Sequence, residues 1–201
     1  MSLFQQKYDK LKDAKLILLI SKGNEDAFNE LYMRYSQHMY AYFYKMLYQD
    51  KELAADFTQT LFLKLYEKAN FYNDQFAFST WIYTMASNMC KNEYRRQSRS
   101  EPIIKIPLQL FDITEPKGPG NLDSEIFQKH LQVAINELEA IHRQCFVLRY
   151  QDELSIKEIA VIVDCPVGTV KSRLYYALKK LSDKLVDFKP NAQKKSNGKN
   201  V

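Results

Sequence analysis

A stretch of small polar, basic and aromatic residues near the C-terminus has the side-chain types that bind DNA. Its members are Thr169, Lys171, Ser172, Arg173, Tyr175, Tyr176 and Lys179. At 100° per residue, most of them lie opposite an apolar stripe that runs from Val170 to Leu185, and Lys171 and Arg173 flank this face. A helix in the major groove contacts bases with small polar side chains and phosphates with cations. The alternative is a helical hairpin with a solvated basic face, and Tyr175 and Tyr176 could equally pack on a neighbouring element.

The residues before this stretch predict a helix-turn-helix. Ser155 and Glu158 form a capping-box pattern at the start of a helix over 155–163, whose apolar residues share one stripe. A short connection containing Pro166 separates this helix from the next, which suits the turn of a helix-turn-helix. Charge is segregated as well, because 152–164 carries four acidic residues and one lysine, whereas 165–186 carries five basic residues and one aspartate.

A second group combines aromatic, amide and basic residues in and after an irregular stretch, 69–78. It comprises Asn70, Phe71, Asn73, Thr80, Trp81, Thr84, Asn88, Lys91 and Arg95. Such residues can stack on an unpaired base and hydrogen-bond to it. The alternative for Trp81 and the neighbouring phenylalanines is that they fill the core.

A third group lies on the predicted helix 51–69 and suits contact with another protein. Asp56, Gln59 and Thr60 lie on the side opposite an apolar face, and Leu63 projects from the middle of this polar side. An exposed leucine framed by acidic and amide groups is a plausible spot for a protein contact.

The sequence does not favour an enzyme. His38, His130 and His142 are isolated, and His142 with Cys145 would supply only half a metal site. The sequence contains neither a glycine-rich phosphate loop nor a serine or cysteine nucleophile signature. We therefore expect no catalytic residue, metal, cofactor or small-molecule substrate.

The elements that carry these residues are predicted to be helices throughout. We expect them near 3–21, 25–48, 51–69, 79–97, 125–138, 142–150, 155–163 and 167–187, with N-caps at Ser2, Asn24, Asp50, Ser79, Ser124 and Ser155. Four prolines and two glycines between Pro102 and Gly120 predict a linker over 98–123. Two small all-α domains are expected on either side, 1–97 and 124–188, followed by a disordered basic tail, 189–201.

Composition fits this organisation. The 201 residues are 46% hydrophobic and 26% charged with a net charge of +5, which suits a folded protein that could bind an anionic partner. Three widely spaced cysteines favour a reducing compartment over a disulfide framework. The longest apolar run, Leu16 to Ile20, is too short to cross a bilayer, so we expect a cytoplasmic chain without membrane insertion.

Two sets of motifs resemble the extracytoplasmic-function (ECF) group of bacterial RNA polymerase sigma factors. The motifs Ala27–Tyr32, Asp56–Tyr66 and Phe78–Asn88 are similar to the family's second conserved region. The motifs Phe146–Tyr150, Leu154–Ala160 and Pro166–Leu174 are similar to its fourth region. The resemblance covers roughly 25–97 and 125–186, in the family's order and spacing.

This resemblance implies a role for each group. The face with Asp56, Gln59, Thr60 and Leu63 would dock on core RNA polymerase. The stretch 69–78 and the helix after it would recognise and open the minus-ten promoter element. The helix-turn-helix, with Ser155 at its first N-cap, would read the minus-thirty-five element. Family members are usually restrained by an anti-sigma factor, so an anti-sigma factor is expected as a further partner.

The sequence departs from the family pattern at several positions. Thr60 stands where glutamate is common, and Tyr176 stands where arginine is common. Asp164 replaces a glycine in the helix-turn-helix bend, and because aspartate tolerates positive φ we expect the turn to survive. The competing interpretation is a stand-alone helix-turn-helix regulator with a helical sensor or dimerisation domain, which would bind duplex DNA without polymerase.

Overall fold

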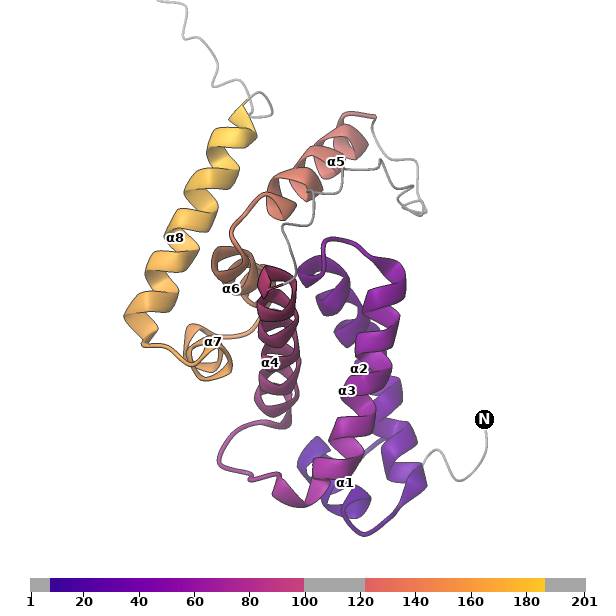
Figure 1. Ribbon diagram of the computed structural model, residues 1–201. Helices are drawn as coiled ribbons and strands as arrows, with labels where there is room; N and C mark the ends of the chain where they lie inside the picture. The colour runs from indigo at the N-terminus through magenta and orange to yellow at the C-terminus, as the bar shows by residue number, and fades with distance from the viewer. Residues whose placement is uncertain (1–7, 100–121, 187–201) are drawn as a thin grey trace, which may run out of the picture.

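The computed structural model describes residues 8–99 and 122–186, and both ranges are helical (Figure 1). The N-terminal block contains α1 (Asp13–Ile20), α2 (Glu25–Met46), α3 (Lys51–Lys68), the 3-10 helix η2 (Ala69–Phe71) and α4 (Phe78–Arg99). The C-terminal block contains α5 (Leu122–Asn136), α6 (Ala140–Tyr150), α7 (Ile156–Val163) and α8 (Val167–Lys184). No strand occurs in these ranges, which confirms the all-α prediction. The predicted linker, apart from two helical residues at each end, and the tail lie outside the described residues.

Three of the predicted N-caps start helices. The side chain of Asn24 accepts a hydrogen bond from Ala27 N at 2.8 Å, and that of Asp50 accepts one from Leu53 N at 2.9 Å. Ser155 and Glu158 make both bonds of the predicted capping box. Ser79 and Ser124 were wrongly predicted as caps, because α4 and α5 begin upstream of them and include them. Ser2 lies outside the described residues.

The first helix is shorter than the predicted 3–21, because α1 begins only at Asp13. Residues 8–12 form turns instead. The carbonyl oxygens of Tyr8, Asp9 and Leu11 accept hydrogen bonds from the Arg34 guanidinium on α2. A distant side chain therefore holds this segment in a non-helical conformation.

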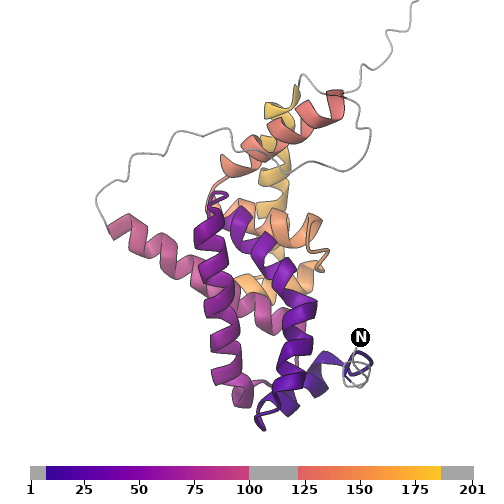
Figure 2. The ribbon, with the colours of Figure 1, turned by 90° about the vertical axis from the view of Figure 1, so that its right-hand side faces the viewer.

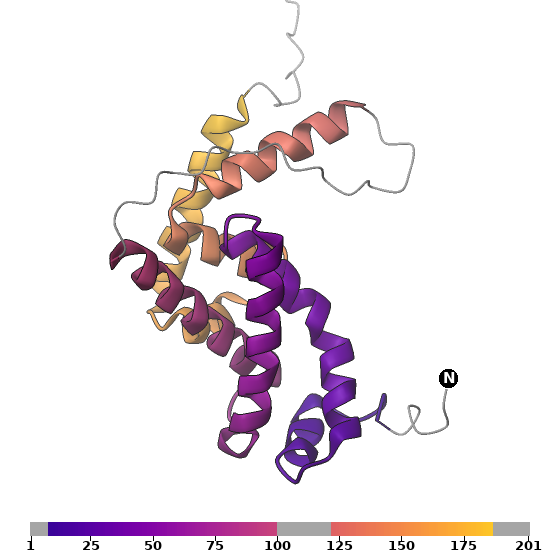
Figure 3. The same cartoon turned by 45° about the vertical axis from the view of Figure 1, so that its right-hand side comes forward.

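Helix α4 forms the side of the N-terminal block that faces the C-terminal block (Figure 1). It packs on α2 and α3 within its own block, and α7 of the C-terminal block packs against it. Figures 2 and 3 show α2 and α3 side by side, with α4 crossing them at an angle. Buried residues of both blocks, such as Ile82, Leu148 and Ile159, join one hydrophobic cluster. We call this packed arrangement the closed form.

Buried polar side chains of α6 fix the contact between the blocks. Gln144 donates from Nε2 to the Tyr42 hydroxyl at 3.0 Å and to Ser87 Oγ at 2.7 Å. Arg143 is fully buried, and its Cζ lies 4.2 Å from the centre of the Tyr48 ring. Burial of unpaired polar groups is costly, so these bonds make the closed form specific as well as compact.

Asp152 provides a titratable group at the same contact. Burial raises the pKa of its carboxyl, and the Tyr83 hydroxyl and the charges of Lys45 and His38 oppose the rise. A raised folded-state pKa means that the stabilising contribution is fully present below the unfolded pKa, near 3.9, and is lost as pH rises through the folded pKa.

We therefore expect Asp152→Asn to abolish this loss of stability. The urea midpoint of the variant should exceed that of the natural chain by an amount that grows as pH rises above about 4 and becomes constant above the folded-state pKa of Asp152. Unfolding curves followed by circular dichroism across this range measure the difference. A constant difference at every pH would contradict the assignment.

Candidate functional site

The predicted irregular stretch, 69–78, comprises η2, a short loop over 72–77 and the first residue of α4, and it has aromatic and amide groups at its surface. Phe71 is 79% exposed and Phe76 is 51% exposed, and Asn70 and Asn73 are exposed as well. Two local bonds shape the loop, because Asn73 Oδ1 accepts from Gln75 N at 3.0 Å and the Tyr72 hydroxyl donates to the Phe76 carbonyl at 3.1 Å. The exposed rings are available for stacking.

Trp81 is placed between core and surface. It is half-buried, and its ring centre lies 5.4 Å from that of Tyr72 and 5.9 Å from that of Phe78. Phe78 is a core residue. The core interpretation is therefore confirmed for Phe78 and wrong for Phe76, and the stacking of Phe71 and Phe76 on a base stays a prediction.

The other predicted minus-ten residues on α4 differ in accessibility. Asn88 and Arg95 are exposed, and Thr84 is half-buried with its hydroxyl bonded to the Thr80 carbonyl at 2.7 Å. Thr80 itself is 2% exposed and lies in the interior. Lys91 donates from Nζ to the Val163 carbonyl at the end of α7, at 3.3 Å. In the closed form, Lys91, which is predicted to contact DNA, therefore bonds to the other block instead.

Helix α3 presents the predicted protein-contact residues on its outer side. Asp56, Gln59 and Thr60 are exposed, and Leu63 is 65% exposed, although Leu61, Phe62 and Leu65 of the same helix are buried. Sequence reasoning missed two more exposed large hydrophobic residues here, Tyr66 on α3 itself and Tyr32 on the neighbouring α2. Tyr66 packs against Phe28, and Tyr32 packs against Phe62. Because the surrounding sequence is rich in aromatic residues, no sequence pattern distinguished these two exposed tyrosines from core residues.

The helix-turn-helix forms as predicted, with a left-handed residue in its bend. Asp164 has φ 55° and ψ 60°, which is the conformation that its tolerance of positive φ allows. The backbone N–H of Cys165 donates to the Ala160 carbonyl at 3.1 Å, and Pro166 then precedes the first residue of α8. The turn therefore survives without the glycine that is common in the family.

The predicted reading face of α8 is largely open. Lys171, Ser172, Tyr175, Tyr176 and Lys179 are exposed, and Thr169 is half-buried. Tyr175 packs edge-on against Tyr176, whose ring centre lies 6.0 Å from that of His142 on α6. Arg173 is half-buried and lies beside the Cys145 thiol, whose pKa burial raises and this guanidinium lowers. The Arg173 side chain therefore lies toward α6 and is less exposed than those of Lys171 and Ser172.

Ser155 is exposed, and its hydroxyl oxygen accepts from Glu158 N at 3.2 Å. The Ser155 hydroxyl oxygen thus caps α7, while its O–H group can still donate a hydrogen bond to another molecule. Cys90 and Cys145 are buried as small core residues. Within the described ranges, no group of three or more potential metal ligands occurs. No helix in these ranges is long and apolar enough to cross a membrane.

Comparison with known proteins agrees with these features. Residues 31–100 match the family described as Sigma-70 region 2, and residues 129–181 match Sigma-70, region 4. The ECF RNA polymerase sigma-E factor of Escherichia coli (strain K12) is 34% identical over 185 residues, which cover 88% of this chain and 96% of that protein. The sigma-E factor of Haemophilus influenzae is 28% identical and is covered over 97% of its length.

Two solved structures share the fold. The sigma factor RpoE in complex with the anti-sigma factor NepR from Bartonella quintana has a TM-score of 0.66 at 21% identity, covering 79% of this chain and 96% of that one. CnrH in complex with the cytosolic domain of CnrY has a TM-score of 0.63 at 19% identity, covering 89% and 99%. The sequence relatives match this chain over almost their whole length, with both conserved regions present. The chain therefore belongs to the ECF sigma factors of bacterial RNA polymerase, the alternative sigma factors that direct transcription initiation.

Proposed function

We propose that three separate surfaces of this sigma factor divide the work of initiation. The outer side of α3, with Asp56, Gln59, Thr60 and Leu63, docks on core RNA polymerase. The loop after η2 and the exposed side of α4 capture the opened minus-ten element. The face of α8, with Ser155 at the start of α7, reads the minus-thirty-five element as duplex.

The observation that carries this proposal is the chemical difference between the three exposed surfaces. An acidic and amide face around a leucine suits a protein, exposed aromatics and amides suit an unpaired base, and a basic polar helix suits a major groove. Because the polymerase and the chromosome lie in the bacterial cytoplasm, we place the chain there. No step of this function requires a catalytic group or a cofactor in the sigma factor itself.

In vitro transcription on a library of random promoters tests the proposal. The chain mixed with bacterial core polymerase should start transcripts at a defined set of sequences, and core polymerase alone should not. Tight binding of one duplex operator without polymerase would instead indicate the stand-alone regulator.

The cations of α8 offer a quantitative test of minus-thirty-five binding. Replacing Lys171 and Lys179 by alanine should make the negative slope of log affinity against log salt shallower by about 2, because each lysine neutralises roughly one phosphate. Titration of holoenzyme on a duplex minus-thirty-five probe at several salt concentrations measures this slope.

A matched control exists on the same helix. Lys180 donates to the Glu137 carbonyl, and Lys184 pairs with the Glu137 carboxylate. Replacing these two lysines removes the same amount of charge, but from side chains that are already bonded to Glu137, the residue after α5. If both double variants changed the slope equally, net charge rather than the reading face would govern binding.

An anti-sigma factor is the remaining proposed partner. Both solved relatives were captured with a binding protein, NepR described as an anti-sigma factor and CnrY through its cytosolic domain. We expect such a protein to compete with core polymerase for this chain. Affinity purification of the tagged chain before and after addition of excess core enzyme tests this competition.

A further inference from the structure

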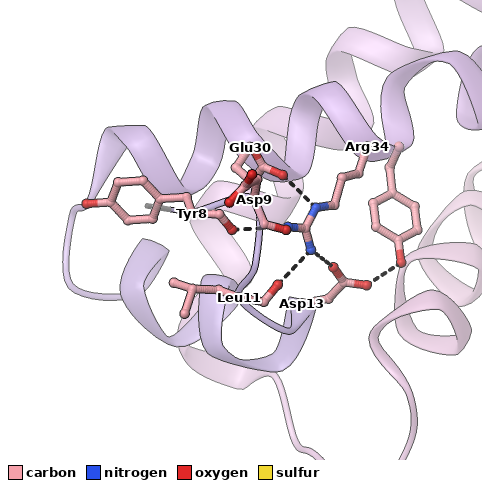
Figure 4. A network of polar contacts seen from close by, with 7 residues as sticks. Tyr8, Asp9, Leu11, Asp13, Glu30 and Arg34 are labelled. Atoms are coloured by element: carbon pink, nitrogen blue, oxygen red, sulfur yellow. Dashed lines mark hydrogen bonds and ion pairs between the residues drawn. The ribbon is translucent and has the colours of Figure 1, made fainter. Parts of the chain in front are cut away.

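The Arg34 guanidinium uses all five of its N–H groups in hydrogen bonds, and four of these bonds hold the N-terminal segment (Figure 4). Nε donates to Glu30, and Nη1 donates to the Leu11 carbonyl and to Asp13, each within 2.7 to 2.8 Å. Nη2 donates to the carbonyls of Tyr8 and Asp9 at 3.1 and 2.7 Å. With five N–H groups satisfied, the start of α1 is fixed against α2.

Asp13 extends this network toward the DNA-binding loop. Its Oδ1 accepts from Arg34, and its Oδ2 accepts from the Tyr35 hydroxyl at 2.6 Å. One carboxylate thus fixes two consecutive residues of α2. Tyr35 is half-buried, and burial together with the bond to Asp13 raises the pKa of its phenol, so the hydroxyl stays a donor at neutral pH.

The Tyr35 ring supports Phe78, the residue that follows the loop. It meets Phe78, the first residue of α4, at 5.1 Å between ring centres and an angle of 72°. Phe78 in turn packs against Tyr72 at 6.0 Å and against Trp81 at 5.9 Å. On the other side of the loop, α1 packs against η2. Helix α1 therefore contacts the element that precedes the loop, and Tyr35 supports the residue that follows it.

We propose that Asp13 and Tyr35 are positioning residues for capture of the unpaired base by the loop from Tyr72 to Ala77. The inference rests on the proposed function of this loop. A surface that receives a flipped base binds it well only if its rings and amides are already in place, because ordering them on binding would reduce the affinity. The chain Asp13–Tyr35–Phe78 holds that arrangement without touching DNA itself.

Tyr35→Phe isolates the hydroxyl–carboxylate bond, because the phenylalanine ring still packs on Phe78. Asp13→Asn is a second variant, whose amide presents only one oxygen where the carboxylate presents two. Tyr40→Phe is the matched control, since it removes a hydroxyl from the same helix at a ring that stacks on Tyr44 outside this network.

The measurement uses holoenzyme assembled from full-length chain and core polymerase. The probe is the fluorescent single strand that natural holoenzyme selects from a random pool. Affinity for core polymerase, affinity for a duplex minus-thirty-five probe and the thermal midpoint are recorded for every variant. We expect Tyr35→Phe and Asp13→Asn to weaken single-strand binding by roughly fivefold. Tyr40→Phe should leave it unchanged, and no variant should alter the two other affinities.

Two further variants separate this inference from the function on which it rests. Phe71→Ala, at the end of η2, and Asn73→Ala, in the loop, alter exposed residues and should weaken single-strand binding by roughly tenfold. If these two weaken binding and Tyr35→Phe does not, the positioning role is wrong while the loop assignment stands. If neither pair has an effect, both are wrong. Equal losses in single-strand, duplex and core affinity would mark Tyr35 as a residue of general stability and would also overturn the positioning role.

Discussion

Asp56→Arg is expected to lower the affinity for core RNA polymerase by roughly 100-fold or more, which is the scale for reversing a charge inside a complementary interface. Asp56 is exposed near the start of α3, on the same side as the exposed Leu63. The fold should not change, because the side chain does not contribute to the core. The thermal midpoint of the variant should therefore match that of the natural chain.

Asp183→Arg is a suitable control for this experiment, because it makes the same charge change at an exposed position on α8. Fluorescence titration of labelled core polymerase without DNA compares the two variants. Asp183→Arg should bind as the natural chain does. An unchanged core affinity for Asp56→Arg would show that this side of α3 is not the docking face.

Local signals predicted the helices and the turn of the helix-turn-helix well. The capping box of Ser155 and Glu158 and the left-handed turn at Asp164 depend on hydrogen bonds between residues no more than five positions apart. Their conformations can therefore be predicted from the neighbouring residues in the sequence. Helical periodicity also indicates that Thr80 is buried, because it places Thr80 on the same side of α4 as Tyr83 and Ser87, which are both buried.

Features that depend on distant partners could not be predicted. The first helix starts late because Arg34 binds carbonyls that lie up to 26 residues earlier. Arg143 and Gln144 are polar residues that precede four buried apolar residues of the same helix. Both bond to residues of the other block, Arg143 to Tyr94 and Gln144 to Tyr42. A sequence pattern marks such residues as unusual but does not identify what they contact, so the closed form itself was not predicted.

The closed form holds the two proposed DNA-reading surfaces much closer together than the minus-ten and minus-thirty-five elements lie on a promoter. Lys91 and Val163 are joined by a hydrogen bond of 3.3 Å, and Thr169 on the reading face follows six residues after Val163. Six residues span at most about 22 Å even when extended. Elements centred 10 and 35 base pairs upstream lie about 85 Å apart at about 3.4 Å per base pair. One chain can therefore engage both elements only after α7 leaves α4.

The segment between the blocks is long enough for this separation. Residues 100–121, which lie outside the described ranges, could extend to roughly 75 Å, and the blocks themselves add to that reach. Opening exposes apolar surface and breaks the two bonds of Gln144. Binding to polymerase and promoter must supply the free energy that offsets this cost.

We expect spin labels on native Cys165 and on Asn92→Cys to lie close together in the free chain, because each is within two residues of the Lys91–Val163 contact. Cys165 is partly exposed, whereas Cys90 and Cys145 are buried and should stay unlabelled. Pulsed electron paramagnetic resonance should give a distance below about 30 Å between the two labels in the free chain. Molecules with this short distance should be absent from holoenzyme bound to a promoter. The short distance persisting in a complex that starts specific transcripts would contradict the opening.

Gln144→Ala tests whether the buried bonds hold the chain closed. The variant leaves the Tyr42 hydroxyl and Ser87 Oγ without their partner, at a cost of about 2 kcal/mol to the closed form alone, so the ratio of open to closed chain should rise roughly 30-fold. Gln97→Ala is the control, because Gln97 bonds only within α4, to Glu93 at 3.0 Å, among the contacts of the described residues. If the contact acts as a restraint, Gln144→Ala should also bind core polymerase more tightly than Gln97→Ala, since less free energy is then spent on opening. Equal core affinities together with a larger open population would mean that polymerase binds the closed chain and that only promoter DNA separates the blocks.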